Sequence, residues 1–275
     1  MTELKQEVVP PCPSQQVCES SNGKISFREQ GKGECLIFLH GLLGSSKAWA
    51  FQFQGFSPEY RVVAWDAPGY GLSDQVPMEI DAYAQALHGL INTLGEEQVT
   101  IVGHSMGGTV ASRYAAQHPE KVKKLVLSCT HPGYAQPQTA PMSEKFEKRM
   151  QELKELGREA YGWNRARDLL PFPEVPQTVL AYAAEVASET NPDGLRRATR
   201  MLQLADNRAC LALLKMPILV LTGEVDKVVQ PRLKEDLLRL TPYQQHIEMP
   251  GVAHAPYFQK PVYYNGLIKN FISAP

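Results

Sequence analysis

A single serine lies within a glycine-flanked run, VGHSMGGTVA, at residues 102–111. The pentapeptide from Gly103 to Gly107 has the form G-x-S-x-G, in which a serine occupies a sharp turn between a strand and a helix. Small neighbours are needed there because the serine backbone is strained. An apolar run precedes the motif and a helical pattern follows it. The sequence therefore predicts that Ser105 is a nucleophile rather than part of a tightly packed turn.

A serine hydroxyl attacks a carbonyl efficiently only when a base removes its proton, and that base needs an orienting carboxylate. For this kind of turn the partners follow in the chain order serine, acid, histidine. His254 lies in MPGVAHAPYFQ, just after the last apolar run and at the sheet edge expected to carry the serine. The remaining histidines fit this order or this position less well, so we predict that His254 is the base.

Two carboxylates compete for the role of the acid. Glu224 and Asp226 both lie in LTGEVDKVV, directly after the apolar run PILVL. Asp226 lies deeper in the loop and is the preferred candidate, with Glu224 as the alternative. The other place from which an acid could reach the histidine, after KLVLS, reads Ser-Cys-Thr-His and contains no carboxylate.

Acyl transfer also requires donors directed at the developing oxyanion. The backbone N–H of Met106, at the start of the helix after Ser105, is one candidate. The backbone N–H of Leu42, in the loop HGLLGSS, is the other. We expect His40 to brace this loop and His104 to pack against the serine turn, so neither is predicted to be catalytic.

The elements that must position these residues follow from apolar periodicity. Short apolar runs bounded by turn residues predict strands buried on both faces of a parallel sheet. They lie at residues 35–39, 61–65, 99–102, 124–128, 217–221 and 245–249. Before them, VCESSNGKISFRE predicts a hairpin with its turn at Asn22-Gly23. Helical patterns such as DAYAQALHGLINTLG fill the intervals. We predict an α/β fold with an eight-stranded, mostly parallel sheet and helices on both of its faces.

One interval, from about residue 131 to residue 214, contains helical patterns and no strand pattern. A structureless loop of that length would be unusual in a compact domain. The interval is therefore predicted to be a helical cap inserted above the sheet edge. The core domain would then comprise residues 1–130 and 215–275.

Size and charge restrict the partners of the protein. The chain has 275 residues, and 43% of them are hydrophobic, which suits one large domain with an insert. Its formal net charge is −1, with 28 basic and 29 acidic residues spread along the chain. We find no basic stripe for nucleic acid, no apolar run of about 20 residues for a membrane span and no apolar signal core at the N-terminus. We expect a cytoplasmic monomer or homodimer that acts on a small molecule.

The cysteines predict neither a metal site nor a disulfide framework. Their number is odd, and no two have the C-x-x-C spacing of a zinc site or a redox pair. They are Cys12, Cys18, Cys35, Cys129 and Cys210. The predicted chemistry likewise uses no metal and no cofactor.

Five segments together resemble the α/β-hydrolase family: HGLLGSSKAW, WDAPGYGLSD, GHSMGGTVASRYAAQHPEKV, GEVD and GVAHAP. They cover nearly the whole chain outside the insert. The resemblance implies the α/β-hydrolase fold with a helical cap. It also implies that Ser105, Asp226 and His254 are the nucleophile, the acid and the base.

Within that family, NPDGLRRATRMLQLADNRACLALLKMP resembles the cap of 3-oxoadipate enol-lactonases and related small carboxylesterases. Those lactonases hydrolyse a small carboxylated lactone, so Arg196, Arg197 or Arg200 could meet a substrate carboxylate. We favour the simpler interpretation that these arginines lie on a solvated helix face. Haloalkane dehalogenases and epoxide hydrolases are similar in fold but have an aspartate in place of Ser105.

We therefore predict a serine hydrolase that cleaves a small carboxylic ester or lactone through an acyl-enzyme. One alternative is a C–C bond hydrolase of the meta-cleavage type, although those enzymes typically have asparagine in place of His104. A second alternative is a ligand receptor on a hydrolase scaffold, which an intact triad does not rule out.

Overall fold

The centre of the protein is an eight-stranded sheet, seen in a computed structural model that describes residues 8–171, 174–242 and 244–274. The strand order is β1-β2-β4-β3-β5-β6-β7-β8. β1 pairs with β2 and β2 with β4 in antiparallel fashion, and every later pairing is parallel. The strands are β1 (Gln15–Ser20), β2 (Gly23–Gln30), β3 (Cys35–Leu39), β4 (Arg61–Trp65), β5 (Val99–His104), β6 (Val122–Ser128), β7 (Ile218–Gly223) and β8 (Gln244–Met249). The predicted mostly parallel sheet is confirmed.

The inner strands are apolar because both of their faces are covered. In β3, Cys35, Ile37 and Leu39 belong to one apolar cluster. Leu36 and Phe38, which point the other way, belong to a second cluster. Side chains alternate along a strand, so a buried parallel strand supplies both layers and reads as a continuous apolar run.

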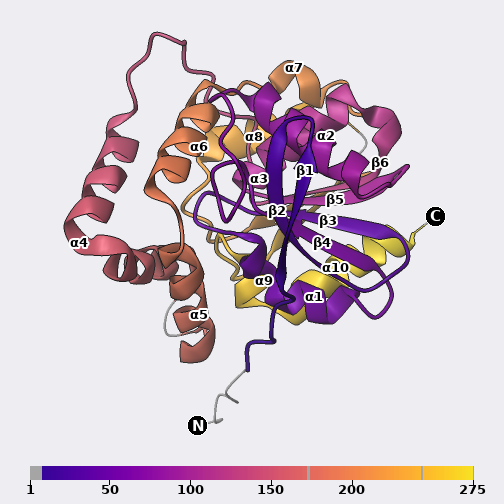
Figure 1. Ribbon diagram of the computed structural model, residues 1–275, viewed down its shortest axis with the longest axis horizontal. Coiled ribbons are helices and arrows are strands. Elements are labelled where there is room, and N and C mark those ends of the chain that lie inside the picture. The colour runs from indigo at the N-terminus through magenta and orange to yellow at the C-terminus, as the bar shows by residue number, and fades with distance from the viewer. Residues whose placement is uncertain (1–7, 172–173, 243, 275) are drawn as a thin grey trace.

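Helices form the two outer layers (Figure 1). α2 and α3 lie on one side of the sheet, and α1 and α10 lie on the other. The helices of the core are α1 (Ala50–Phe56), α2 (Ile80–Thr93), α3 (Met106–Gln117), α8 (Pro231–Leu240), α9 (Pro256–Gln259) and α10 (Pro261–Ser273), with short 3-10 turns η1 (Ser46–Trp49) and η2 (Pro119–Lys121).

The hairpin turn differs by one residue from the prediction. Ser20 pairs with Gly23 across the ladder, so the turn residues are Ser21 and Asn22 rather than Asn22 and Gly23. The Ser20 hydroxyl accepts from the backbone N–H of Asn22 at 3.1 Å and donates to the carbonyl of Gly23 at 2.9 Å. These two bonds close the turn one residue earlier. The first seven residues of the chain lie outside the described residues.

Between β6 and β7 the described residues form helices and no strand. The helices are α4 (Glu144–Leu169), α5 (Gln177–Ser188), α6 (Pro192–Leu204) and α7 (Arg208–Leu211). α4 and α5 pack together at one side of the sheet, while α7 packs against α3 and α8 of the core. α4 is kinked at Gly157, where φ is 75°. We call α4, α5 and α6 the cap segment; the division into two domains at residues 131 and 214 stays a prediction.

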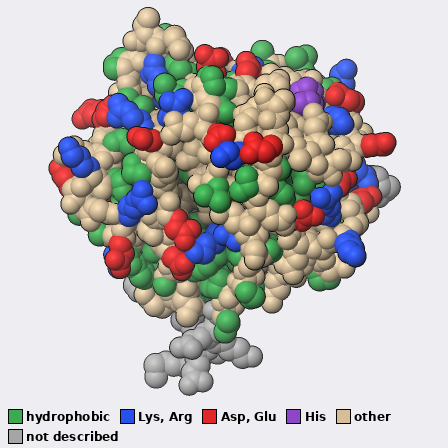
Figure 2. All heavy atoms as spheres, viewed as in Figure 1, with side chains coloured by type: hydrophobic (Ala, Val, Ile, Leu, Met, Phe, Trp, Pro, Cys, Tyr) green, Lys and Arg blue, Asp and Glu red, His purple; other side chains and the backbone are tan. Residues whose placement is uncertain are grey.

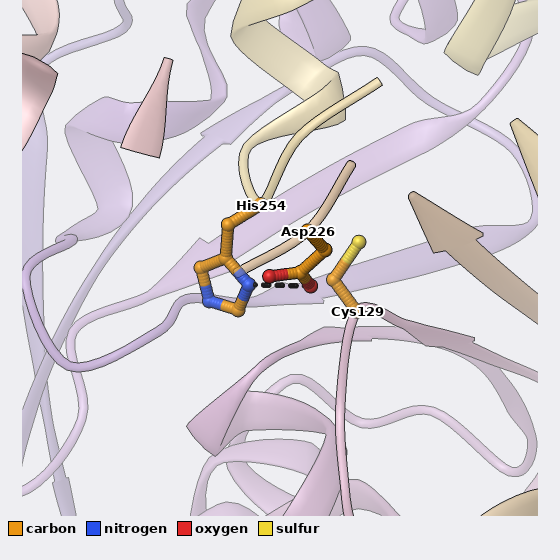
Figure 3. A group of neighbouring side chains, drawn as sticks. All are labelled: Cys129, Asp226 and His254. Carbon is orange, nitrogen blue, oxygen red and sulfur yellow. Dashed lines mark hydrogen bonds and ion pairs between the residues drawn. The ribbon is translucent and has the colours of Figure 1, made fainter. Parts of the chain in front are cut away.

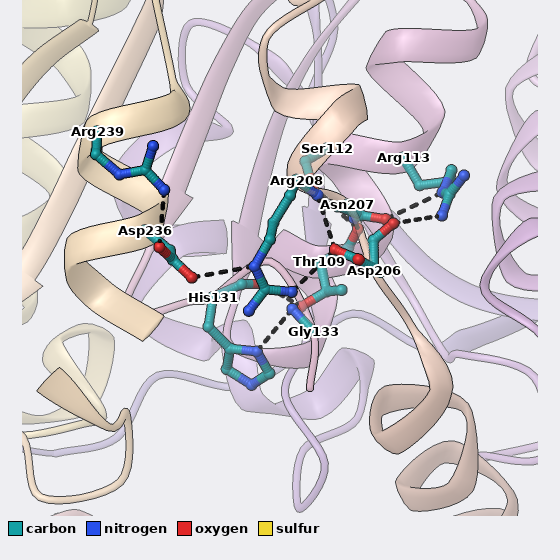
Figure 4. A network of polar contacts seen from close by, with 10 residues as sticks. All are labelled: Thr109, Ser112, Arg113, His131, Gly133, Asp206, Asn207, Arg208, Asp236 and Arg239. Atoms are coloured by element: carbon teal, nitrogen blue, oxygen red, sulfur yellow. Dashed lines mark hydrogen bonds and ion pairs between the residues drawn. The ribbon is translucent and has the colours of Figure 1, made fainter. Parts of the chain in front are cut away.

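A polar network joins the end of the cap segment to the core (Figure 4). Asn207 donates from Nδ2 to the carbonyl of Thr109 at 2.7 Å and accepts from Arg113 at Oδ1 at 3.0 Å. Arg208 next to it pairs with Asp206 at 2.9 Å and with Asp236 of α8 at 3.0 Å. The chain that returns from the cap segment is therefore fastened to the helix that follows Ser105.

The surface carries charges of both signs. On the face drawn in Figure 2, basic and acidic side chains are interspersed, without a large area of one sign. Among the helices that the structure describes, none has both the length and the apolar character needed to cross a lipid bilayer.

Candidate active site

Ser105 lies on the turn between β5 and α3 in a backbone conformation that is uncommon for a residue with a side chain. Its φ is 52° and its ψ is −118°. A Cβ added to Gly103 would lie 2.6 Å from the carbonyl oxygen of Gly107, and one added to Gly107 would lie 2.2 Å from that of Leu39. Both distances are well inside van der Waals contact. The two glycines are therefore required for the strand and the helix to approach each other around Ser105.

Strand β6 holds this turn in place. The backbone N–H of Ser105 donates to the carbonyl of Ser128 at 3.0 Å. The hydroxyl of Thr130 donates to the carbonyl of Ser105 at 2.5 Å. No motif in the sequence marks Thr130 as a contact of Ser105. The two residues come together only because β5 pairs with β6. Two contacts, one from the last residue of β6 and one from the loop after it, thus hold the strained residue.

His254 and Asp226 form a close pair beside this turn (Figure 3). Nδ1 of His254 lies 2.9 Å from Oδ2 of Asp226, and their side chains are only 4% and 7% exposed. Oδ1 of Asp226 accepts from the backbone N–H groups of Val228 and Val229, at 2.8 and 3.3 Å. Burial alone would raise the pKa of Asp226, but the hydrogen bond and charge of His254 and these two N–H groups lower it below its usual value. The ionised carboxylate keeps a proton on Nδ1 and leaves Nε2 free to accept another.

Glu224 is directed elsewhere. Its carboxylate is exposed and accepts from the backbone N–H of Gly251 at 2.7 Å. The structure therefore brings Asp226, and not Glu224, into contact with His254.

Cys129 lies beside the pair, at the end of β6. The ligand atoms of Cys129, Asp226 and His254 lie within 4.8 Å of one another, close enough to share a metal ion. However, burial raises the pKa of the Cys129 thiol, and the charge of Asp226 raises it further. The Cys129 side chain is therefore a neutral thiol beside the His254–Asp226 pair.

Ser105 and His254 line one pocket of about 50 Å³. Its walls include the loop from Gly41 to Gly44, and two residues of α4, Arg149 and Leu169. Within the described part of the chain, the hydroxyl of Ser105 makes no hydrogen bond. Catalytic contacts of this kind often tighten only when substrate binds. The structure thus brings Ser105 and His254, which contacts Asp226, to one small pocket.

The loop that contains Leu42 passes directly over the serine turn. A Cβ on Gly41 would lie 3.1 Å from the Cβ of Ser105 and 3.0 Å from Nδ1 of His104. The N–H groups of Leu42 and Met106 donate to no protein atom among the described residues. Both are therefore available as donors next to Ser105.

His40 braces this loop from below. Its Nε2 accepts from the backbone N–H of Ala67 at 3.0 Å, so Nδ1 carries the proton and donates to the carbonyl of Gly41 at 2.7 Å. Burial lowers the pKa of His40, which keeps the ring neutral. Tyr70 adds a second brace by donating its hydroxyl to the carbonyl of Leu42 at 2.8 Å.

Two further buried histidines lie close to His254. Nε2 of His104 donates to the carbonyl of His254 at 2.7 Å, and Nδ1 of His131 accepts from the N–H of Gly133 at 3.0 Å (Figure 4). Burial lowers the pKa of His104 to about 3 and that of His131 to about 4, and electrostatic repulsion from the His254 ring adds to both shifts. Both rings are neutral near pH 7, so their role is packing and hydrogen bonding.

These neutral histidines make the fold sensitive to acid. The folded pKa of His131 is about 4, against an ordinary value of 6.5, so between these values the unfolded chain binds a proton that the folded chain does not. The contribution of each such histidine to the free energy of unfolding is therefore fully present above about pH 6.5. It decreases towards pH 4 by about 1.4 kcal/mol per pH unit. In His131→Asn the amide oxygen replaces Nδ1 as the acceptor. We expect the variant to take up about one proton fewer on unfolding in this pH range, so the slope of its unfolding free energy against pH should be smaller. Urea unfolding at several pH values measures the slope, and an unchanged slope contradicts the prediction.

The arginines singled out from the sequence lie away from this pocket. Arg196, Arg197 and Arg200 line a separate depression, on the surface of α6. Arg196 lies 3.4 Å from Glu147, while Arg197 and Arg200 donate to backbone carbonyls at 2.7 to 2.8 Å. The cation at the Ser105 pocket is Arg149 instead, which the sequence reasoning missed. A helical pattern indicates which residues share a face but not what that face covers.

Comparisons with known proteins identify the fold family of the chain. A family model described as alpha/beta hydrolase fold matches residues 34–261. A pimeloyl-(acyl-carrier protein) methyl ester esterase of Vibrio vulnificus is 29% identical over 253 residues, which cover 86% of this chain and 93% of that protein. A 2-hydroxy-6-oxononadienedioate/2-hydroxy-6-oxononatrienedioate hydrolase of Comamonas testosteroni is 36% identical over 114 residues, 39% of this chain and 40% of that protein.

Solved structures share the fold. The crystal structure of the enol-lactonase from Burkholderia xenovorans LB400 superposes with a TM-score of 0.82, covering 94% of this chain and 100% of that chain. The two sequences are 20% identical, so this likeness concerns the architecture alone.

Proposed function

Because this chain belongs to the alpha/beta hydrolase fold family, we propose that it is a serine hydrolase that cleaves a small carboxylic ester or lactone. The proposed nucleophile is Ser105, the base is His254 and the acid is Asp226. Residues 131–214 would form a cap over the site. The chemistry requires water as the second reactant and no cofactor.

In the proposed reaction, Oγ of Ser105 attacks the carbonyl carbon while its proton passes to Nε2 of His254. The N–H groups of Leu42 and Met106 stabilise the oxyanion. His254 then gives the proton to the leaving alkoxide as the C–O bond breaks, which produces the acyl-enzyme. Water, deprotonated by the same imidazole, attacks the acyl carbon. The imidazolium then gives this proton to Oγ of Ser105 as the bond between the acyl carbon and Oγ breaks, which releases the acid and the free serine. Asp226 stabilises the imidazolium in both steps.

The observation that carries this proposal is the 2.9 Å contact between His254 and Asp226 at the pocket of Ser105. The strained φ of 52° at Ser105 supports it, because such strain concentrates at functional sites. The pocket of about 50 Å³ suits a short acyl group better than a long chain. The ester named for the Vibrio vulnificus relative supports ester chemistry.

A second candidate is C–C bond hydrolysis of a dienoic diketone. The partial match to the Comamonas testosteroni protein favours it, and the same three side chains suit that reaction. His104 weighs against it, since the meta-cleavage hydrolases that this chain resembles typically have asparagine there.

A substrate panel separates these functions. Purified protein is assayed with 4-nitrophenyl acetate and butyrate, a series of small lactones and enol lactones, and a vinylogous diketone. We expect the highest kcat/KM with an ester or a lactone. Preferred cleavage of the diketone would replace the proposal with the second candidate. Stoichiometric labelling of Ser105 by a fluorophosphonate without turnover of any substrate would instead favour a ligand receptor.

A further inference from the structure

Arg149, in the first half of α4, is one of the residues that line the pocket of Ser105 and His254. Its side chain is half-buried, and its guanidinium carbon lies 5.8 Å from the ring centre of Phe146. Such a contact between a cation and an aromatic ring restrains the direction of the guanidinium. Arg149 is thus part of the pocket wall rather than a freely solvated side chain.

Packing of α4 fixes this position. Leu153, four residues after Arg149, is buried in an apolar cluster with Tyr161 and Leu195. Leu42 and Leu43, from the loop beside Ser105, pack against the same cluster. Residues four apart lie on one face of a helix. Anchoring Leu153 on the loop therefore directs Arg149 towards the pocket.

No carboxylate of the described residues lies within 4.0 Å of Arg149, whereas two other cap arginines, Arg165 and Arg196, have acidic partners. Arg165, for example, pairs with Glu152 at 3.1 Å and with Asp168 at 2.9 Å. The carboxylate of Asp226, at the same site, is already held by His254. Arg149 therefore lines the pocket without a carboxylate counter-ion among the described residues.

A guanidinium keeps its charge at every relevant pH and presents a planar fork that matches a carboxylate. The pocket wall around it contains Leu42, Leu43 and Leu169, so water screens its charge less than at an open surface. Burial lowers the pKa of Lys145, and the positive charge of Arg149 lowers it further. A carboxylate bound to Arg149 would compensate the positive charge of its guanidinium.

We propose that Arg149 selects substrates that carry a second carboxylate, separate from the ester or lactone carbonyl that reacts at Ser105. The substrate class is the monoesters and lactones of short dicarboxylic acids. This inference rests on the proposed function of Ser105. Arg149 binds the distant carboxylate and thereby positions the reacting carbonyl; it takes no part in proton transfer.

The test compares two esters of matched shape, 4-nitrophenyl hydrogen glutarate and 4-nitrophenyl 5-methylhexanoate. In the second ester an isopropyl group replaces the free carboxylate. The variants are Arg149→Met, Arg149→Lys and Arg196→Met as a cap control, and rates in Ser105→Ala give the background. We expect Arg149→Met to lower the ratio of kcat/KM for the charged over the neutral ester by about 10- to 100-fold. Arg149→Lys should lower it less, and Arg196→Met should leave it unchanged.

A ratio unchanged in Arg149→Met, or lowered equally by Arg196→Met, overturns the inference but leaves the proposed function intact. Turnover of both esters that persists in Ser105→Ala overturns the proposed function instead. Calorimetric titration with glutarate gives a readout independent of turnover. We expect at least about tenfold weaker binding to Arg149→Met than to the wild type, and equal affinity contradicts the inference. Unchanged melting temperatures verify that the variants are folded.

Discussion

Replacing Ser105 with alanine should lower kcat for 4-nitrophenyl acetate by about 10⁴-fold or more. The hydroxyl is the atom that forms the acyl-enzyme, and no other group at the pocket can replace it. Cys129, the neighbouring thiol, is buried at the end of β6, and burial raises its pKa, so it supplies no thiolate. Steady-state assays of the variant, corrected for spontaneous hydrolysis, measure the loss.

The matched control is Ser112→Ala, seven residues further on, in the helix α3 that follows Ser105. The hydroxyl of Ser112 is buried and donates to the carbonyl of Thr109 at 3.0 Å, so its removal should affect stability more than turnover. A fluorophosphonate should label wild-type protein at Ser105 and leave Ser105→Ala unlabelled, as mapped by mass spectrometry. Near-native turnover in Ser105→Ala would make the nucleophile assignment wrong.

His254→Gln should reduce kcat by a similar factor, about 10⁴-fold or more. Without the imidazole, no base accepts the proton of Ser105 and no acid protonates the alkoxide. The buried rings of His104 and His131 cannot compensate, since one donates to the carbonyl of His254 and the other accepts from Gly133. His246→Gln is the control, because Nε2 of His246 lies 2.9 Å from the hydroxyl of Thr222. A comparable loss in both variants would show that the effect is not specific to His254.

The carboxylate partner should have a smaller effect, about 10²- to 10⁴-fold in Asp226→Asn, because the amide still contacts the ring but no longer stabilises its charge. In Glu224→Gln the amide oxygen can still accept from Gly251, so activity should be close to wild type. Equal activity of the two variants would leave the acid unassigned and contradict the geometry in which Asp226 alone contacts His254.

Much of the sheet was predictable because its signal is local. The runs at residues 35–39 and 61–65 coincide with β3 and β4, since a strand buried on both faces must be apolar throughout. β6 and β8 begin earlier than predicted, at Val122 and Gln244. Polar residues at a strand end still join the ladder through their backbone, and apolar periodicity does not register them.

In the candidate site, too, some residues could be predicted from the sequence and others could not. Ser105, Asp226 and His254 could be predicted as candidates because each follows a strand, and parallel strands of one sheet end at one edge. Arg149 was missed and Arg196 was singled out instead, although both lie on amphipathic cap helices. The difference between them is which face packs on the loop beside Ser105, and that depends on Leu153 and its distant apolar partners.

The sequence by itself determined the strained serine turn, the order of its partners and the layered sheet. These follow from short-range sterics and from apolar periodicity, which act within a few residues. Only the tertiary structure decided that Asp226 rather than Glu224 contacts His254, and that Arg149 faces the pocket without a counter-ion. The physical reason is that side-chain direction in loops and in the kinked α4 is set by packing between segments far apart in the chain, a long-range effect that no local pattern contains.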